Sequence, residues 1–424
     1  MAAFDPRKGA RVRWTLILIA ACLTVRGLWT TTAHAGDWPQ ILGPHRDGRA
    51  EHESLADAWP AGGPKVVWER PVGRGYAGVA VVGERGVLFH RVESEEVVEA
   101  FAAKTGKSSW KYAIPTSYVS GISPDDGPRC VPIIHGDRVI VFGVQGNLAC
   151  LRLADGNKLW ARDTHAEFRV GEGYFGAGSS PIVEGDKVIV NVGGKKTGAG
   201  IVAFALDTGK PVWNVTHEDA SYSSPIAVTV NGVRNVIVET RLKTVVLNPD
   251  TGAIRSELEF GMRGPTVNGA NPTVMGDRLF MTASYGIGAV FAKIGSASLE
   301  KLWESNDLIS SQYATCIADG GVLYGIHGRD DQGQASLRCI DPDKQKVVWE
   351  KDDFGYATLL WTDGKLIVQK TDGTFVLVKA TPTQYTELAS AQVFNAKTFA
   401  LPALAAGRVY ARDDHTLKCL DVGR

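Results

Sequence analysis

Residues 182–213 read IVEGDKVIVNVGGKKTGAGIVAFALDTGKPVW, and this stretch decides the fold. Near each end, a turn with a glycine separates two runs of β-branched and apolar residues, at Gly185 and at Gly209. Glycine adopts a positive φ at no steric cost, which tight turns between antiparallel strands require. The stretch therefore predicts two hairpins, that is, four short antiparallel strands.

The first of these hairpins recurs along the chain. Eight copies place a glycine between two β-rich runs: VVGERGVLF (81–89), IIHGDRVIV (133–141), IVEGDKVIV (182–190), TVNGVRNVIV (229–238), TVMGDRLFM (273–281), IADGGVLYG (317–325), WTDGKLIVQ (361–369) and LAAGRVYAR (404–412). Their turn glycines are Gly83, Gly136, Gly185, Gly232, Gly276, Gly320, Gly364 and Gly407. After the first interval, successive glycines are 43 to 49 residues apart. A constant period of this length is typical of repeat folds, including propellers.

The second hairpin follows the first by about 20 residues. Its copies are AFAAKTGKSSW (100–110), CLRLADGNKLW (150–160), AFALDTGKPVW (203–213) and VLNPDTGAIRS (246–256), with weaker ones at 291–303 and 339–349. A tryptophan marks the strand after this turn, or an equivalent strand, at Trp68, Trp110, Trp160, Trp213, Trp303 and Trp349. Because a tryptophan at one fixed place in each repeat supplies a large buried area, this column indicates packing between neighbouring sheets rather than a cofactor site.

The two ends of the chain complement each other. VVWERPV (66–72) resembles the last strand of a repeat although no repeat precedes it, and the final repeat ends at Val422 before its own tryptophan strand. A four-stranded sheet buries its faces by stacking radially on its neighbours, and closing the ring removes the exposed ends. The sequence therefore predicts an all-β protein: an eight-bladed β-propeller of four-stranded antiparallel blades over residues 66–424, closed by the N-terminal strand, after a lead-in at 36–65. A β-sandwich or a β-solenoid is the alternative, but a solenoid would have shorter repeats and no complementary ends.

Charge and composition limit the choice of partner. The chain has 46 basic and 46 acidic residues and a formal net charge of zero, which argues against nucleic acid as a partner. No segment after the first 35 residues is apolar enough to span a bilayer. We expect a monomer.

The first 35 residues are typical of an export signal, which two processing routes fit. Residues 7–13 are basic, Trp14 to Leu23 are apolar, and Ala33-His34-Ala35 is a cleavage site before Gly36, which makes residues 1–35 a signal peptide. Alternatively, Ile19-Ala20-Ala21-Cys22 fits a lipobox, so that 1–21 would be the signal and Cys22 would be lipidated. Both routes predict export to the periplasm or cell envelope. The second adds a lipid anchor as the only membrane contact, and an uncleaved N-terminal anchor is the third alternative.

The tryptophan repeat resembles the A-x-D-x-x-T-G-x-x-x-W motif of quinoprotein-type propellers. Ala203, Asp207 (displaced by one place), Thr208, Gly209 and Trp213 carry it best. This group includes pyrroloquinoline quinone (PQQ) alcohol dehydrogenases and BamB-like outer-membrane assembly lipoproteins. The segments DWPQ (37–40) and GPHRDG (43–48) are also similar to the opening of secreted bacterial PQQ-like repeat proteins. The resemblance implies the propeller fold and is silent about activity; WD40 propellers fit less well, because the Gly-His and Trp-Asp pairs are missing at the repeat spacing.

The reactive side chains form no recognisable catalytic or metal-binding pattern. Cys150 and Cys339 stand where sister repeats have alanine, so we expect buried free thiols. The nine histidines show no zinc-binding spacing, and Asp125-Asp126 and Asp330-Asp331 do not have the spacing of a calcium loop. The adjacent cysteine pair that lies over the cofactor in quinoprotein dehydrogenases is also missing. No catalytic residue and no metal ligand is therefore predicted.

One repeated feature is a candidate binding site. Just before each inner strand stands an aromatic or polar residue among small ones, at Tyr76, Phe175, Tyr222, Asn268, Tyr313, Tyr356 and Phe399. The inner strands of a propeller start at one mouth of its central channel, so these side chains are expected to surround that mouth. They would either grip a peptide, a glycan or a planar ligand, or pack together and plug the channel.

Two functions remain. The preferred one is a non-catalytic binding or scaffold propeller of the cell envelope, BamB-like, with an envelope protein, a peptide or a small ligand as its partner and no cofactor. The alternative is a PQQ-dependent oxidoreductase that also needs calcium. Because a fold hosts many functions, the preference rests on the resemblance and on the missing catalytic pattern.

Overall fold

The computed structural model describes residues 1–2, 36–171, 173–264, 266 and 268–424. The chain divides into the units Met1–Thr32 and Ala33–Arg424, and all described secondary structure belongs to the second unit. The predicted signal peptide, with Cys22, lies almost wholly in residues 3–35, outside the described part, so export and lipidation stay predictions. In the part of the chain that is described, no helix has the length and apolar character needed to cross a membrane.

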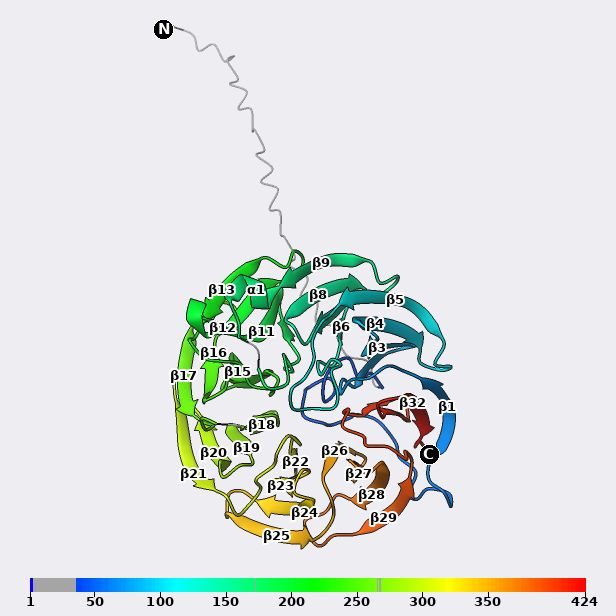
Figure 1. Cartoon of the computed structure of the whole chain (residues 1–424). Coiled ribbons are helices and arrows are strands. Elements are labelled where there is room, and N and C mark those ends of the chain that lie inside the picture. Colours follow the sequence, from blue (N-terminus) through cyan, green and yellow to red (C-terminus); the bar gives the residue numbers. More distant parts are fainter. Residues whose placement is uncertain (3–35, 172, 265, 267) are drawn as a thin grey trace. The chain divides into compact units, whose positions relative to one another are not determined.

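The second unit is an eight-bladed propeller, as the repeat predicts. Eight sheets of four antiparallel strands each are arranged around a common centre (Figure 1). Blade 1 consists of β2 (Val79–Val82), β3 (Arg85–Val92), β4 (Glu95–Ala102) and β5 (Ser108–Pro115); blade 2 of β6 (Ile133–His135), β7 (Arg138–Phe142), β8 (Asn147–Arg152) and β9 (Lys158–Asp163). Blade 3 consists of β10 (Ile182–Glu184), β11 (Lys187–Gly194), β12 (Ala199–Ala205) and β13 (Pro211–Val215); blade 4 of β14 (Ile226–Val230), β15 (Val233–Glu239), β16 (Lys243–Leu247) and β17 (Ile254–Glu259).

The remaining blades follow the same order from the innermost strand to the outermost. Blade 5 consists of β18 (Thr273–Met275), β19 (Arg278–Ala283), β20 (Gly288–Ile294) and β21 (Leu299–Ser305); blade 6 of β22 (Ile317–Asp319), β23 (Val322–Arg329), β24 (Gln334–Asp341) and β25 (Lys346–Lys351). Blade 7 consists of β26 (Ala357–Thr362), β27 (Lys365–Lys370), β28 (Thr374–Lys379) and β29 (Glu387–Gln392); blade 8 of β30 (Ala403–Ala405), β31 (Arg408–Arg412), β32 (Thr416–Asp421) and β1 (Lys65–Pro71). The only described helices are α1 (Thr164–Phe168) after blade 2 and the 3-10 helix η1 (Lys195–Thr197).

The glycine turns that decide the fold have the conformation that the repeat predicts. All eight turn glycines of the first hairpin have positive φ, between 54° at Gly83 and 75° at Gly232. Gly106, Gly156, Gly209 and Gly252, in the second hairpin, also have positive φ. An L-residue with a side chain is strained in this region, so the glycines fix where each hairpin turns.

The N-terminal strand closes the ring, which confirms the prediction from the two chain ends. β1 pairs antiparallel with β32, from Lys65 opposite Asp421 to Pro71 opposite Thr416. A buried cluster of charges joins this strand to blade 1: the Arg70 guanidinium donates to a Glu99 carboxylate oxygen at 2.8 Å, and His90 Nε2 lies 3.2 Å from the other oxygen. Burial by itself would raise the pKa of Glu99, but hydrogen bonds from His90 and Arg70 outweigh it and lower the pKa to about 2.

The tryptophan column lies between the blades. Each indole N–H donates to a backbone carbonyl of the next blade; Trp68, for example, donates to Ala103 O at 2.9 Å and Trp110 to Leu153 O at 2.9 Å. The same contact is made by Trp160, Trp213, Trp303 and Trp349. A methyl group added at Gly106 would lie 2.7 Å from the Trp68 ring, so the glycine makes room for the indole.

The lead-in segment crosses one face of the ring, which we call the turn face because the first hairpin turn of every blade and the second hairpin turn of blades 1 to 7 lie there. Trp38 pairs with Val81 of blade 1 through two backbone hydrogen bonds of 2.7 and 2.8 Å. Farther along, Gly48 O accepts from Trp361 N, and Ala50 N donates to Trp361 O of blade 7. Glu53 accepts from two backbone N–H groups of blade 8. The lead-in therefore contacts several blades, and the most distant contacting residues lie about 350 positions farther along the sequence.

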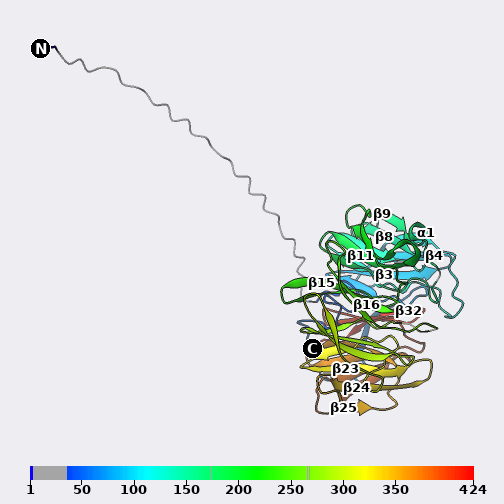
Figure 2. The ribbon, with the colours of Figure 1, turned by 90° about the vertical axis from the view of Figure 1, so that its left-hand side faces the viewer.

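Arg46 extends this segment into the ring. Its side chain is almost fully buried and donates to Ser180 O, Pro181 O and Pro225 O of blades 3 and 4 and to Gln40 Oε1 at 2.8 Å. Desolvation lowers the pKa of Arg46 to about 9, because its partners are neutral oxygens. Figure 2 shows the ring from the side, turned by 90° from Figure 1.

Candidate binding face

The opposite face, which we call the connection face, carries the turn between the second and third strands of each blade. It also carries the segments that join one blade to the next. All seven predicted mouth residues stand on these joining segments, directly before or near the innermost strands. The structure brings six of them together in three pairs from neighbouring blades. Ring centroids are 5.0 Å apart in Tyr76–Phe399, 5.5 Å in Phe175–Tyr222 and 4.4 Å in Tyr313–Tyr356.

These aromatic residues also form hydrogen bonds with one another within the protein. Tyr222 Oη accepts from Phe175 N at 2.9 Å, and Tyr356 Oη accepts from Tyr313 N at 2.6 Å. Burial raises the pKa of Tyr222 to about 12, so its hydroxyl stays protonated. Much of their surface is therefore used to join blades, and Tyr222 alone of the seven lines one of the large hollows described below.

Asn268, the seventh predicted residue, is fully buried. Its side-chain Nδ2 lies 3.3 Å from Thr240 O. Its backbone carbonyl accepts from the backbone N–H groups of Tyr222 and Ser223. The side chain thus faces neighbouring segments of blade 4 rather than solvent. A ligand arriving at this face would not reach it without rearrangement.

Arg129 occupies the blade 2 position that has no aromatic residue in the sequence pattern. Its guanidinium lies 5.4 Å from the Tyr76 ring centroid and 6.0 Å from that of Phe175, which are cation–π distances. It also donates to the backbone carbonyls of Asp125 and Gly127. The sequence position could have indicated Arg129 as a mouth residue, because it stands four residues before its inner strand, as Tyr222 does in blade 4.

A belt of hydrogen bonds underlies the mouth and ties blades 2 to 6 together. Val131 N donates to Ser180 Oγ at 2.9 Å, Ser180 N to Ser224 Oγ at 2.8 Å, Ser224 N to Asn271 Oδ1 at 2.8 Å, and Asn271 N to Thr315 Oγ1 at 2.9 Å. Each side-chain oxygen accepts a hydrogen bond from a backbone N–H group of the preceding blade, so the belt holds the joining segments in place. This rigid support is what a binding face on loops requires.

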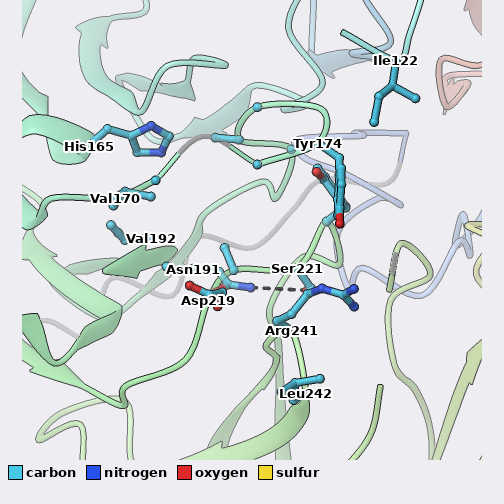
Figure 3. A pocket seen from close by; sticks show the side chains of 18 of the residues that line it. Ile122, His165, Val170, Tyr174, Asn191, Val192, Asp219, Ser221, Arg241 and Leu242 are labelled. Atoms are coloured by element: carbon cyan, nitrogen blue, oxygen red, sulfur yellow. Dashed lines mark hydrogen bonds between the residues drawn. The ribbon is translucent and has the colours of Figure 1, made fainter. Parts of the chain in front are cut away.

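A hollow of about 720 Å³ opens on the connection face between the joining segments of blades 2 to 5 (Figure 3). Asn191 and Ser221 contribute buried polar groups, and Arg241 and Tyr174 contribute larger side chains. Arg241 donates to Gly264 O at 2.7 Å and to Thr266 Oγ1 at 2.9 Å, both neutral oxygens. Burial lowers the pKa of His165, another lining residue, so its imidazole is neutral at pH 7.

A second hollow of about 640 Å³ lies beside the first, toward blades 5 and 6. Met262, Arg263 and Thr266 belong to its lining, and Arg263 also lines the first hollow. On its far wall, the Arg329 guanidinium lies 4.3 Å from the centroid of Tyr285 and pairs with the Asp331 carboxylate. The two hollows therefore form one groove, which we call the two-hollow groove.

Exposed apolar side chains gather around this groove. Ile122 is 60% exposed, Tyr174 45% and Met262 45%, and all three line the groove and stand on segments that join blades. The sequence pattern singled out Phe175 in this region, whereas its neighbour Tyr174 is the residue that lines the hollow. Exposed apolar groups that gather on one face are typical of a site that a partner covers.

The described residues show no set of at least three Cys, His, Asp or Glu side chains arranged to hold a metal ion. The five described cysteines are buried free thiols, and burial raises the pKa of Cys150 and Cys339 to about 12. Glu239 is buried, and desolvation raises its pKa well above the usual value. These groups suit a packed interior rather than acid–base chemistry in the groove.

A planar redox cofactor at the channel mouth would need a free ring face on which to stack. The three aromatic pairs there are tilted or edge-on, with interplanar angles of 48°, 55° and 70°, and Arg129 packs between Tyr76 and Phe175. The mouth residues that the structure describes therefore do not fit such a group as they stand. That the protein carries no cofactor remains a prediction.

The fold and this face define a PQQ-like repeat β-propeller. A family model described as outer membrane protein assembly factor BamB matches residues 58–174 and 94–351 of the chain. Together these matches span well over half of the sequence, and the chain belongs to this family. Comparison with curated proteins gives no significant match.

Solved structures share the architecture at low sequence identity. BamB from Moraxella catarrhalis is 16% identical, with a TM-score of 0.60 over 84% of this chain and 96% of that one. The quinohemoprotein alcohol dehydrogenase from Comamonas testosteroni is 15% identical, with a TM-score of 0.53 over 93% and 82% of the two chains. The computationally designed Ika8 protein is 14% identical, with a TM-score of 0.60 over 85% and 100%. Likeness at this level establishes the fold alone.

Proposed function

We propose that this protein is a non-catalytic binding propeller of the bacterial cell envelope, which holds a partner on its connection face. One observation carries the proposal: the exposed apolar side chains Ile122, Tyr174 and Met262 surround the two-hollow groove on that face. The opposite face has the chain's own lead-in bound across it. A partner would therefore approach the connection face.

Three further observations support this function. The family to which the chain belongs is described by an outer-membrane assembly factor. The segment at residues 1–35 has the basic, apolar and cleavage regions of an export signal. The belt beneath the connection face holds its loops in place, which limits the entropy that binding would cost.

The test is site-specific photo-crosslinking in the native host. A benzophenone amino acid replaces Tyr174 on the connection face, and a matched variant carries it in place of Lys210, which is exposed on the turn face. The proposal expects a discrete adduct with an envelope protein at position 174 that unlabelled protein competes away, and none at position 210. Equal adducts at both positions, or none at either, would contradict it.

A further inference from the structure

The lining of the two-hollow groove differs in charge from the rest of the molecule. The chain as a whole is balanced, with 46 basic and 46 acidic residues. Among the described residues, the groove is lined by Arg241, Arg263 and Arg329, by a single carboxylate, Asp219, and by no lysine or glutamate. Arginine without lysine or glutamate is typical of the centre of a protein interface.

The charges of the groove are only partly neutralised. Asp219 pairs with Lys195 at 3.1 Å, and Arg329 pairs with Asp331. Arg241 donates to neutral oxygens, and Arg263 is exposed and forms no ion pair with any described residue. The groove therefore presents two guanidinium groups whose charge nothing described in the structure compensates.

The lining of the first hollow suits a main chain rather than a compact ligand. Seven of its 21 lining residues are glycines, at positions 121, 171, 173, 176, 178, 193 and 264. A Cβ atom built on the exposed Gly121, Gly171 or Gly264 would meet nothing within 4 Å, so the backbone of a ligand can come close to that of the protein there. Ile122 and Tyr174 line the same hollow and Met262 lines the second one, so apolar side chains of the ligand also find contacts.

We propose that the two-hollow groove binds an extended peptide segment with alternating acidic and apolar side chains, supplied by a partner protein. This inference rests on the proposed function and specifies the chemistry of the partner. The arginines receive the carboxylates, the apolar side chains receive the alternating apolar residues, and the exposed glycines admit the main chain.

Fluorescence anisotropy of labelled eight-residue peptides with the purified protein tests the inference. The probe is DYDLDYDL, and the matched controls are SYSLSYSL and KYKLKYKL, all at 50 mM NaCl. We expect the acidic peptide to bind at least tenfold more tightly than the neutral one. Arg263→Ser is expected to weaken its binding about tenfold, because a charge-assisted hydrogen bond is lost, whereas Lys210→Ser on the turn face leaves binding unchanged. Raising the NaCl concentration to 300 mM should also weaken binding.

Equal affinity for the acidic and neutral peptides, or no effect of Arg263→Ser in a protein with an unchanged melting temperature, overturns the inference. Competition by the neutral oligosaccharide maltohexaose does the same, because the groove would then be a glycan site. If the peptides fail while the crosslink at position 174 persists, the binding function stands with a partner of different chemistry. If both fail, the proposed function fails as well.

Discussion

Gly106→Ala tests how the blades are joined. Gly106 has φ of 70°, and a Cβ atom there would lie 2.7 Å from Trp68 Cε3 and 2.9 Å from Cδ2. The indole has little freedom to retreat, because its N–H donates to Ala103 O and its ring contacts Phe101 at a centroid distance of 5.7 Å. The substitution therefore adds a steric clash to the strain of a left-handed alanine.

Gly83→Ala is a matched control that separates the cost of left-handed strain from the cost of the steric clash. Gly83 has φ of 54°, and a Cβ atom there would meet nothing within 4 Å. Gly83→Ala should cost about 1–2 kcal/mol of unfolding free energy from left-handed strain, partly offset by the lower entropy of the unfolded chain. Gly106→Ala carries the same strain and about 1–3 kcal/mol more from overpacking against the indole. The difference between the two variants measures the contact between blades.

Equilibrium denaturation by urea, followed by circular dichroism, gives both values. In a Trp68→Ala background, Gly106→Ala should cost only the strain, so the double-mutant cycle should show a coupling of about 1–3 kcal/mol. If Gly106→Ala is no more destabilising than Gly83→Ala, the tryptophan column does not hold the blades as described.

Three further predictions concern processing, thiols and pH. Mass analysis of the protein from its native host should find a start at Gly36 or a lipidated Cys22, whereas an intact Met1 would contradict export. Thiol reagents should label Cys150 and Cys339 slowly in the native protein and rapidly in denaturant, because both are buried with a pKa of about 12; a cystine at either position would contradict this. Glu99→Gln should lower the unfolding free energy at pH 7 by about 3 kcal/mol, because it leaves the largely buried Arg70 guanidinium without its ion-pair partner. The folded-state pKa of Glu99 is lowered to about 2, so its contribution to the unfolding free energy is complete above the unfolded pKa and is lost as the pH falls toward 2. In acid titrations of stability, the difference in unfolding free energy between Glu99→Gln and wild type should therefore shrink from pH 5 to pH 2. A constant difference would refute the assignment.

The architecture was predictable because it is local and repeated. Glycine turns such as Gly185 and Gly209 carry the register of each blade, and both adopt the positive φ that the pattern requires. Ring closure was also predictable, because the surplus strand at Trp68 and the missing strand of blade 8 are both visible in the sequence.

The binding face was less predictable, because its residues come from segments that differ in length and composition from blade to blade. Tyr174 and Phe175 are adjacent and chemically alike, and only packing decides that Tyr174 lines the hollow. Arg129 takes a place that an aromatic residue holds in most other blades. The lead-in contacts were not foreseen either, since hydrogen bonds between Glu53 and the backbone of residues 406 and 407 leave no periodic signal.

We propose that this propeller binds a partner and does not catalyse an oxidation. The most direct measurement is dye reduction by the purified protein, mixed with PQQ and calcium and offered a panel of alcohols and sugars. Oxidation requires a base and a Lewis acid held against the substrate as well as a bound cofactor. We expect no PQQ-dependent rate above that of protein-free controls. A rate that saturates with substrate and is abolished by Tyr222→Ala or Tyr313→Ala would contradict it and make the protein a PQQ-dependent oxidoreductase.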